Sequence, residues 1–517
     1  LQCQTGRHFF FTRACIFFVF KDLLFKLIFI TLCSCKNFKQ MLTFIISIGL
    51  LIVAYFTYGK FVERFFGASS TIATPVKRLA DGVDYHELKP WRIFVIQFLN
   101  IAGLGPIFGA ILGAAYGPMA YIWIVIGCIF MGATHDYFSG MLSIRHDGTS
   151  LPDIVGKYLG NNVRKFMTFF TGFLLLAVGV SFVNGPADLL GNLTNMSMTP
   201  WLYVIFAYYI LATLLPIDKI IGKIYPFMGL ALIFMAVAVG SYLLYGGFSG
   251  KLYIEELTFD TMKNMHADPA NNILFPMLFI VISCGAISGF HATQSPMMAR
   301  CMTDEKYGRP IFYGAMISEG IVAMIWATAA MAYFGGAEGL NAAATAGKTP
   351  AIIVDAICNS WLGRFGAIIA IIGVVVCPIT SGDTAFRSMR LIIADALKFN
   401  QKPIKNRLIV SIPIFIIAYL LCNVDFSTIW KYVGIGNQVL ATITLWTAAT
   451  YLAKKGKAHW MMSIPATFLS IVCTTYFLIA PYKVGGLYLS SSISYPIGAI
   501  VGIGLFVLFI TKITKNK

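Results

Sequence analysis

The chain has 517 residues, of which 58% are hydrophobic and 12% are charged, whereas a typical soluble domain has roughly 45–50% apolar and about 25% charged residues. This composition excludes an ordinary soluble fold and is typical of a protein embedded in a lipid bilayer. Lys and Arg number 39 against 22 Asp and Glu, for a net charge of +17. We do not expect nucleic acid as a partner, because the basic residues lie in short connections between apolar runs.

The first 40 residues are expected to be a non-native extension. The chain begins with Leu, and Lys21, Asp22 and Lys26 interrupt a weakly apolar stretch, whereas Met41 opens a clean apolar run. A signal peptide and a genuine extra helix over 14–32 are the alternatives.

From Met41 onward, thirteen apolar stretches are candidates to cross a bilayer, which takes about 17–25 helical residues; the stretch at 201–215 is short. The predicted spans are 42–59, 91–113, 119–139, 166–188, 201–215, 224–245, 272–291, 311–334, 365–386, 407–422, 432–452, 460–480 and 495–511. Alternate connections carry 27 and 6 Lys and Arg. Because basic residues stay on the cytoplasmic side, we expect the C-terminus to be cytoplasmic and Met41 to be external.

Two glycine-rich interruptions lie inside membrane-length apolar segments, from Asn100 to Pro106 and from Cys284 to His291. A bilayer tolerates unwound backbone only where it lines a polar cavity. The second segment comes five predicted spans after the first, and this odd offset makes the two cross in opposite directions. We therefore predict an all-α polytopic membrane protein with a five-plus-five inverted-repeat core, a discontinuous first helix in each repeat and about three additional helices.

This fold divides the chain into four parts after residue 40. The predicted parts are an additional N-terminal helix (41–70), a first repeat of five helices (91–245), a second repeat of five helices (272–452), and two C-terminal helices with a short basic tail (460–517).

The two breaks are the predicted substrate site, because the N-terminus of a half-helix can hold a carboxylate. The side chains after the second break are expected at the cytoplasmic mouth. The predicted substrate-binding residues are Asn100, Gly103, Gly105, Gly285, Gly289, His291, Thr293 and Gln294. The alternative is that the glycines only permit close helix packing, which we favour for Gly109 and Gly113 because they continue a small-residue stripe.

Placing an ionisable side chain inside the bilayer costs free energy, so such residues are candidates for a function such as ion or proton coupling. Asp383 lies at a further Pro/Gly interruption among hydroxyl groups, which suit a small cation or a relayed proton. His135 and Asp136 are expected at the cytoplasmic end of the third span, where a helix-end hydrogen-bond network is the alternative. The predicted residues for ion or proton coupling are Thr380, Ser381, Asp383, Thr384, His135, Asp136 and Glu319.

We predict no catalytic residues, cofactor or metal. The sequence has no H-E-x-x-H or G-x-S-x-G motif of a hydrolase. Its eleven cysteines form no C-x-x-C pair and no spacing with histidine that suits zinc. Most of them lie in apolar runs, where a thiol behaves as a small hydrophobe.

Five runs of sequence resemble the carbon starvation protein A family over most of residues 41 to about 450. The runs are 105–118, 132–143 with Arg145, 150–156, 289–300 and 380–390. The resemblance implies a secondary transporter of the inner (plasma) membrane, in the amino acid/polyamine/organocation superfamily. It implies uptake of peptides during carbon starvation, or of pyruvate, coupled to a cation. H+ is the expected coupling ion and Na+ is the alternative, because carboxylate and hydroxyl groups serve both. A small carboxylate or short peptide is therefore the expected substrate, with a membrane nutrient sensor as the alternative function.

Overall fold

A computed structural model describes residues 38–80, 85–214, 225–401, 403–424 and 426–515. Helices form the regular structure of these residues, and no strand occurs among them. Residues 1–37 lie outside the described residues, so the expectation of a non-native extension stays a prediction.

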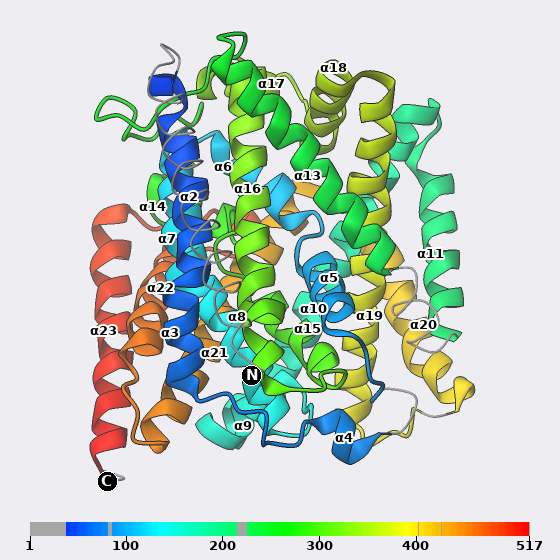
Figure 1. Cartoon of the computed structure of the whole chain (residues 1–517), viewed down its shortest axis with the longest axis vertical. Coiled ribbons are helices and arrows are strands. Elements are labelled where there is room, and N and C mark those ends of the chain that lie inside the picture. Colours follow the sequence, from blue (N-terminus) through cyan, green and yellow to red (C-terminus); the bar gives the residue numbers. More distant parts are fainter. Residues whose placement is uncertain (1–37, 81–84, 215–224, 402, 425, 516–517) are drawn as a thin grey trace, which may run out of the picture.

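The first part of the bundle leads from the N-terminal helices to the first broken segment and the helices after it. Its elements are η1 (Phe38–Met41), α2 (Leu42–Phe56), α3 (Tyr58–Phe66), α4 (Pro75–Leu79), α5 (Pro90–Ile101), η2 (Gly105–Gly109), α6 (Ala110–Ala114), α7 (Met119–Ile126), η3 (Gly127–Gly132), α8 (Ala133–Arg145), α9 (Leu151–Leu159), α10 (Asn161–Thr194), α11 (Met198–Leu214) and α13 (Tyr225–Phe248). In Figure 1, α4 and α9 lie at one end of the bundle and α17 lies at the other.

The second part begins at the second broken segment and ends at the C-terminal helix. Its elements are α14 (Leu274–Val281), α15 (Gly289–Ala299), η4 (Glu305–Tyr307), η5 (Arg309–Tyr313), α16 (Gly314–Tyr333), α17 (Ala337–Thr345), α18 (Pro350–Ile371), η6 (Ile372–Val376), α19 (Cys377–Ala396), α20 (Ile404–Leu421), α21 (Phe426–Lys454), α22 (Trp460–Ile479), η7 (Tyr482–Val484) and α23 (Ser491–Lys515).

In the part of the chain that the structure describes, every predicted span overlaps a helix or a run of interrupted helices. Within the described residues, eight helices are long and apolar enough to cross a membrane, and a bent pair, α5 with η2 and α6, makes a ninth. The other four predicted spans are the short α11, the broken α14–α15, the segment from α18 into α19, and α21. The expected all-helical polytopic architecture is therefore confirmed, whereas the division into two repeats stays a prediction.

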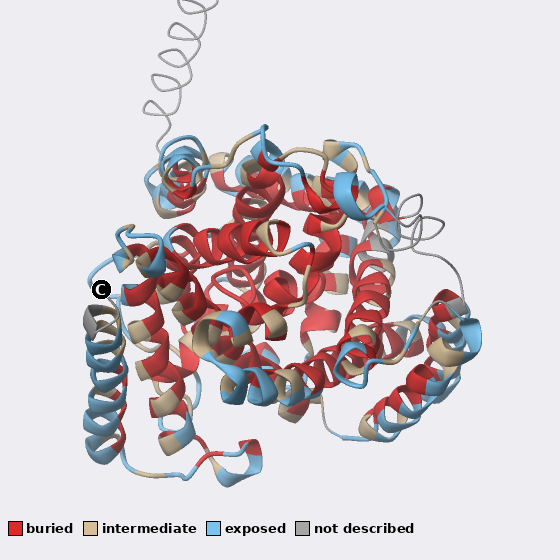
Figure 2. Cartoon of the chain, turned by 90° about the horizontal axis from the view of Figure 1, so that it is seen from below, coloured by how far each residue is buried: buried red, intermediate tan, exposed pale blue. Residues whose placement is uncertain are grey.

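The distribution of buried residues separates central helices from lipid-facing ones. Figure 2 shows a buried interior surrounded by exposed helical faces. In the most apolar 18-residue stretch of the helix from Glu305 to Phe334, 89% of residues are buried, against 22% in the corresponding stretch of α23. The exposed face of α23 carries large apolar residues such as Ile500 and Val507. An apolar exterior of this kind suits contact with lipid chains, and it places α16 at the centre.

Candidate functional site

The structure contains the first predicted break, in the segment from Asn100 to Pro106. α5 ends at Ile101, and the chain resumes as η2 at Gly105 with a change of direction of 50°. η2 is a π-helical turn, a rare conformation that is frequent at functional sites. Proline at the second position of η2 lacks an N–H group, so it cannot continue the hydrogen-bond ladder of α5.

The second predicted break is also present. α14 ends at Val281, and α15 begins at Gly289. Between them Gly285 has a φ of +91°, a conformation that residues with a Cβ atom rarely adopt. The two breaks that carried the fold prediction are therefore both confirmed.

The two breaks pack directly against each other. A Cβ atom at Gly105 would collide with Cys284, and one at Gly113 would collide with the side chain of Ile282. A Cβ atom at Gly109 would lie 3.0 Å from the carbonyl oxygen of Val281. The packing interpretation of Gly109 and Gly113 agrees with these contacts, and the same close approach brings Gly105 to the second break.

Side chains from other helices bind the backbone groups that the second break leaves without helical partners. Glu319 of α16 accepts a hydrogen bond from the N–H of Gly285 at 3.1 Å. The side-chain oxygen of Asn437 accepts one from the N–H of Phe290 at 3.1 Å. Non-helical backbone inside a membrane needs such partners. The sequence analysis missed Asn437, because nothing in the sequence of α21 indicates which backbone group its amide would contact.

Four buried ionisable side chains form a continuous row beside the second break, which we call the imidazole–carboxylate chain: His135, Asp136, His291 and Glu319. One oxygen of Asp136 lies 2.8 Å from Nδ1 of His135, and the other lies 2.9 Å from Nδ1 of His291. Nε2 of His291 lies 3.4 Å from Oε2 of Glu319. All four side chains are at most 1% exposed. The structure thus joins one predicted substrate-binding residue to three predicted coupling residues.

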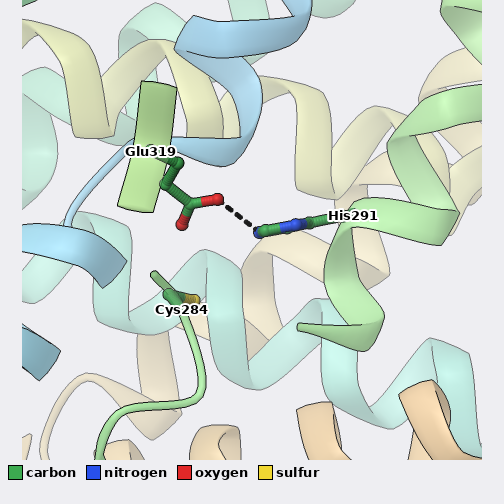
Figure 3. Close-up of side chains that lie close together, drawn as sticks. All are labelled: Cys284, His291 and Glu319. Carbon is green, nitrogen blue, oxygen red and sulfur yellow. Dashed lines mark ion pairs between the residues drawn. The ribbon is translucent and has the colours of Figure 1, made fainter. Parts of the chain in front are cut away.

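The contact between His291 and Glu319 brings two acceptors together when the imidazole is neutral and its Nδ1 carries the proton. When Nδ1 of His291 donates to Asp136, a neutral imidazole has only a lone pair at Nε2. Nε2 of His291 and Oε2 of Glu319 form no hydrogen bond with any described residue, although they face each other (Figure 3). A cation between them, either a proton or a metal ion, would remove the repulsion between the two lone pairs.

The expected position of His135 and Asp136 at a helix end is wrong. They lie in the first turn of α8, inside a 27-residue span from Met119 to Arg145. The π-helical turn η3 precedes them, and a Cβ atom at Gly132 in this turn would collide with the carbonyl group of Ala286 in the second break. The pair therefore lies deep in the bundle, and its hydrogen bonds reach His291 rather than a helix end.

A second buried polar centre, which we call the Asp383–Arg387 pair, lies on α19. Oδ2 of Asp383 accepts a hydrogen bond from the hydroxyl of Tyr225 at 2.8 Å and lies 3.5 Å from Nη2 of Arg387. Arg387 also donates to the carbonyl of Ala212 at 3.1 Å. The carboxylate therefore has a cationic partner one helical turn away, which the sequence analysis missed although the spacing of four residues on a helix was visible.

The hydroxyl groups near Asp383 do not converge on its carboxylate. Thr380 and Thr384 donate to carbonyl groups of their own helix, and Ser381 donates to the carbonyl of Leu99 at 3.0 Å. The expected interruption at this position is wrong, because α19 continues from Cys377 to Ala396 and the irregular turn, η6, comes before it. The described geometry therefore offers no ready set of oxygen ligands around Asp383.

Unpartnered amide groups mark the end of α5 before the first break. Neither the oxygen nor the nitrogen of the Asn100 amide forms a hydrogen bond with a described residue, and the same holds for Gln97. Both side chains are fully buried, and their separation of three residues places them on one face of the helix. The sequence analysis missed Gln97, although a lone amide in the run from Ile93 to Leu99 was a usable signal.

The predicted substrate residues of α15 are not at an open mouth. Thr293 and Gln294 are buried, and Gln294 donates to the hydroxyl of Thr293 at 2.9 Å. A Cβ atom at Gly289 would meet the backbone of α21 near Asn437 and Ala441. The mouth expectation is therefore wrong, and Gly289 has a packing role in this structure. All fifteen predicted site residues are buried, as expected of a site closed to solvent.

A cavity of about 240 Å³ approaches the first break from the side of α18. Its lining includes Phe108 of η2, Asn184 and Asp188 of α10, Pro350 at the start of α18, and Phe426 of α21. A Cβ atom at Gly185 in the same lining would lie 2.9 Å from the side chain of Leu104 in the first break. Only a few side chains therefore separate this cavity from the unwound segment.

Ion pairs join the helices at the opposite end of the bundle, near α4 and α9. Arg145 at the end of α8 binds Glu305, with 2.8 Å between Nη2 and Oε2, and also donates to the carbonyl of Gly67. Arg309 pairs with Glu63 at 2.8 Å. Glu305 is fully buried, so these contacts close this end of the bundle.

Comparisons with known proteins agree with this geometry. The sequence matches the carbon starvation protein CstA family over residues 39–184, 172–365 and 337–476. The peptide transporter CstA of Bacillus subtilis is 26% identical over 533 residues, covering 83% of this chain and 88% of that protein. The pyruvate/proton symporter BtsT of Escherichia coli is 25% identical over 343 residues, covering 55% of this chain and 48% of the symporter.

A solved structure shares the fold. A Na+-coupled sialic acid symporter, in a substrate-bound outward-open state, superposes with a TM-score of 0.51 at 14% identity, covering 90% of this chain and 97% of the symporter. At this identity the likeness shows the fold alone. It confirms the expected class, a core of the five-plus-five inverted-repeat kind.

Proposed function

The chain belongs to the carbon starvation protein CstA family and is a membrane transporter, and on this premise we propose that it takes up a small carboxylate or a short peptide together with a proton. The observation that carries the proposal is the contact between the two breaks, with a buried row of titratable groups beside it. Relatives named as a peptide transporter and as a pyruvate/proton symporter support the same substrate classes.

The imidazole–carboxylate chain is the proposed proton-coupling site. Its two imidazoles and two carboxylates leave the number of bound protons open, and the 3.4 Å contact between His291 and Glu319 has room for one of them. Buried ionisable groups of this kind mark proton relays in transporters. Asp383, with Thr380, Ser381 and Thr384, is the second candidate, and its pairing with Arg387 makes it the weaker one.

The proposed substrate position lies between the end of α5 and the start of α15. The unpartnered amides of Asn100 and Gln97 can donate to a carboxylate, and the N-terminus of α15 adds the favourable end of a helix dipole. Gly103 and Gly105 allow the backbone to approach closely, whereas Gly285 gives the second break its left-handed turn. A carboxylate is common to pyruvate and to a peptide, so both fit this chemistry.

Alternating access is the proposed transport mechanism. The cavity at Phe108 lies on the side of α18, and the ion pairs of Arg145 and Arg309 close the other end. The basic connections lie at the closed end, which we propose to be cytoplasmic together with the C-terminus. The cavity is then the external access route, in a protein of the inner (plasma) membrane.

An uptake panel with purified protein in liposomes tests the proposal. Labelled pyruvate, dipeptides and amino acids are offered under an inward proton gradient, with Na+ replaced by choline and with an uncoupler as control. We expect accumulation of one carboxylate class that the uncoupler abolishes and Na+ replacement does not. Binding without accumulation under any gradient would contradict the proposal and favour a nutrient sensor.

A further inference from the structure

A second kind of cation fits the groups beside the second break. Cys284, His291 and Glu319 each offer one ligand atom, and the three atoms lie within 4.8 Å of one another. They come from three segments, the unwound chain after α14, the first turns of α15, and α16 (Figure 3). We propose that these three residues form a binding site for a divalent transition metal of the zinc class.

The distance between two of the ligand atoms matches metal coordination. A tetrahedral zinc ion with bonds of about 2.0–2.1 Å to nitrogen and oxygen holds these two atoms about 3.3–3.4 Å apart. Nε2 of His291 and Oε2 of Glu319 are 3.4 Å apart. A charge-assisted hydrogen bond would be shorter, about 2.7–2.9 Å, and neither atom forms a hydrogen bond with a described residue.

The surroundings orient both ligands as known metal sites do. Asp136 binds Nδ1 of His291 at 2.9 Å, and this carboxylate–histidine arrangement turns Nε2 toward a metal. The N–H of Gly285 binds Oε1 of Glu319 at 3.1 Å, which leaves Oε2 for coordination. Sγ of Cys284 donates a weak hydrogen bond to Oγ of Ser288 at 3.6 Å. Because Cys284 lies in unwound chain rather than in a helix, exchanging this bond for a metal bond requires no helix to bend.

The ligand types select the metal. A thiolate with an imidazole and a carboxylate suits zinc or cobalt and disfavours magnesium and calcium, which prefer oxygen alone. Three protein ligands leave a fourth position open for water or for another ligand. Because the ion would use the same lone pairs as the coupling proton proposed above, we expect zinc to inhibit proton-coupled uptake.

Cobalt binding to the purified full-length protein tests the site without any transport assay. We expect about one Co2+ per chain, with a thiolate-to-cobalt charge-transfer absorption band that excess Zn2+ removes. Cys284→Ser should abolish the band, and Glu319→Gln should weaken binding at least about 10-fold. Cys473→Ser, which changes another buried cysteine, is the matched control and should leave both unchanged.

A second measurement on the unmodified protein guards against misfolded variants. Zn2+ should slow alkylation of Cys284, followed by mass spectrometry of its peptide, and should leave alkylation of Cys473 unchanged. Absence of the cobalt band, or a band that persists in Cys284→Ser, would overturn the metal site. Either result leaves the uptake proposal standing, because no gradient or substrate enters these experiments.

Discussion

The two buried polar centres both contain a carboxylate but differ in charge balance. In the Asp383–Arg387 pair one carboxylate faces one guanidinium at 3.5 Å, and Tyr225 completes its hydrogen bonds. In the imidazole–carboxylate chain two carboxylates alternate with two imidazoles, and the contact at its end has no hydrogen bond. The first centre is neutral without an added ion, whereas the charge of the second depends on protons. Burial alone therefore does not distinguish a coupling site from a structural ion pair. A better criterion is whether each buried carboxylate has a permanently charged partner such as Arg387.

Asp136→Asn should have the largest effect on transport. The variant removes the charge that holds both imidazoles, so we expect gradient-driven accumulation to fall to background. Exchange of labelled for unlabelled substrate should continue, because exchange moves no net proton. Both rates are measured in liposomes, with Asp153→Asn as the control, since the side chain of Asp153 is 31% exposed and pairs with Arg164 away from both centres. Normal accumulation by Asp136→Asn would remove the imidazole–carboxylate chain from the coupling mechanism.

Asp383→Asn should act mainly on stability. The substitution leaves the buried guanidinium of Arg387 without its carboxylate, and breaking a buried pair typically costs about 3–5 kcal/mol. We expect a lower melting temperature in detergent. The double variant Asp383→Asn/Arg387→Gln should recover most of the loss, because it removes both charges.

The opposite result would reverse the comparison of the two centres. If Asp383→Asn keeps the melting temperature of the unmodified protein but no longer accumulates substrate, then Asp383, one of the coupling residues that the sequence predicted, is the one that couples transport.

Asn100→Ala should have an intermediate effect on substrate binding. α5 packs against α15, α16 and α19 and therefore contacts helices of both centres. Loss of one hydrogen bond to a bound carboxylate, worth about 1.5 kcal/mol, corresponds to a roughly 10-fold rise in KM with little change in kcat. The exposed Asn359→Ala is the control. An unchanged KM would place the substrate away from the first break.

Gly103→Ala should have the smallest effect. Its Cβ atom would lie 3.0 Å from the hydroxyl of Ser381, so the hydrogen bond from Ser381 to Leu99 would weaken, at a cost of about 1 kcal/mol. Gly172→Ala is the matched helical control, because nothing lies within 4 Å of its Cβ position. It should be stabilising by about 0.5–1 kcal/mol. Thermal unfolding in detergent measures both, and equal changes would argue against contact between the first break and α19.

The sequence predicted the features that depend on local chain chemistry. Glycine and proline positions located both breaks, and membrane-length apolar runs located the helices. The same reasoning wrongly predicted a helix interruption near Asp383, where α19 is continuous. Pro378 does not break this helix because it lies in the first turn, where proline is tolerated.

Long-range contacts could not be predicted in the same way. Glu319 lies 28 positions after His291 in the sequence, and only the packing of α16 against the second break brings the two together. Tyr225 reaches Asp383 from 158 positions away. Because no local pattern encodes such distances, the sequence analysis listed most of the right residues without showing which of them form one site.

Glu319 links chemistry to the shape of the chain through its two oxygen atoms. Oε1 holds the N–H of Gly285 in the unwound segment, and Oε2 faces His291. Any event that changes the charge of this carboxylate changes, at the same time, how firmly it anchors the backbone turn. Ion binding at Oε2 of Glu319 can therefore weaken or strengthen the hydrogen bond from Gly285 to Oε1, and with it the position of the unwound segment between α14 and α15.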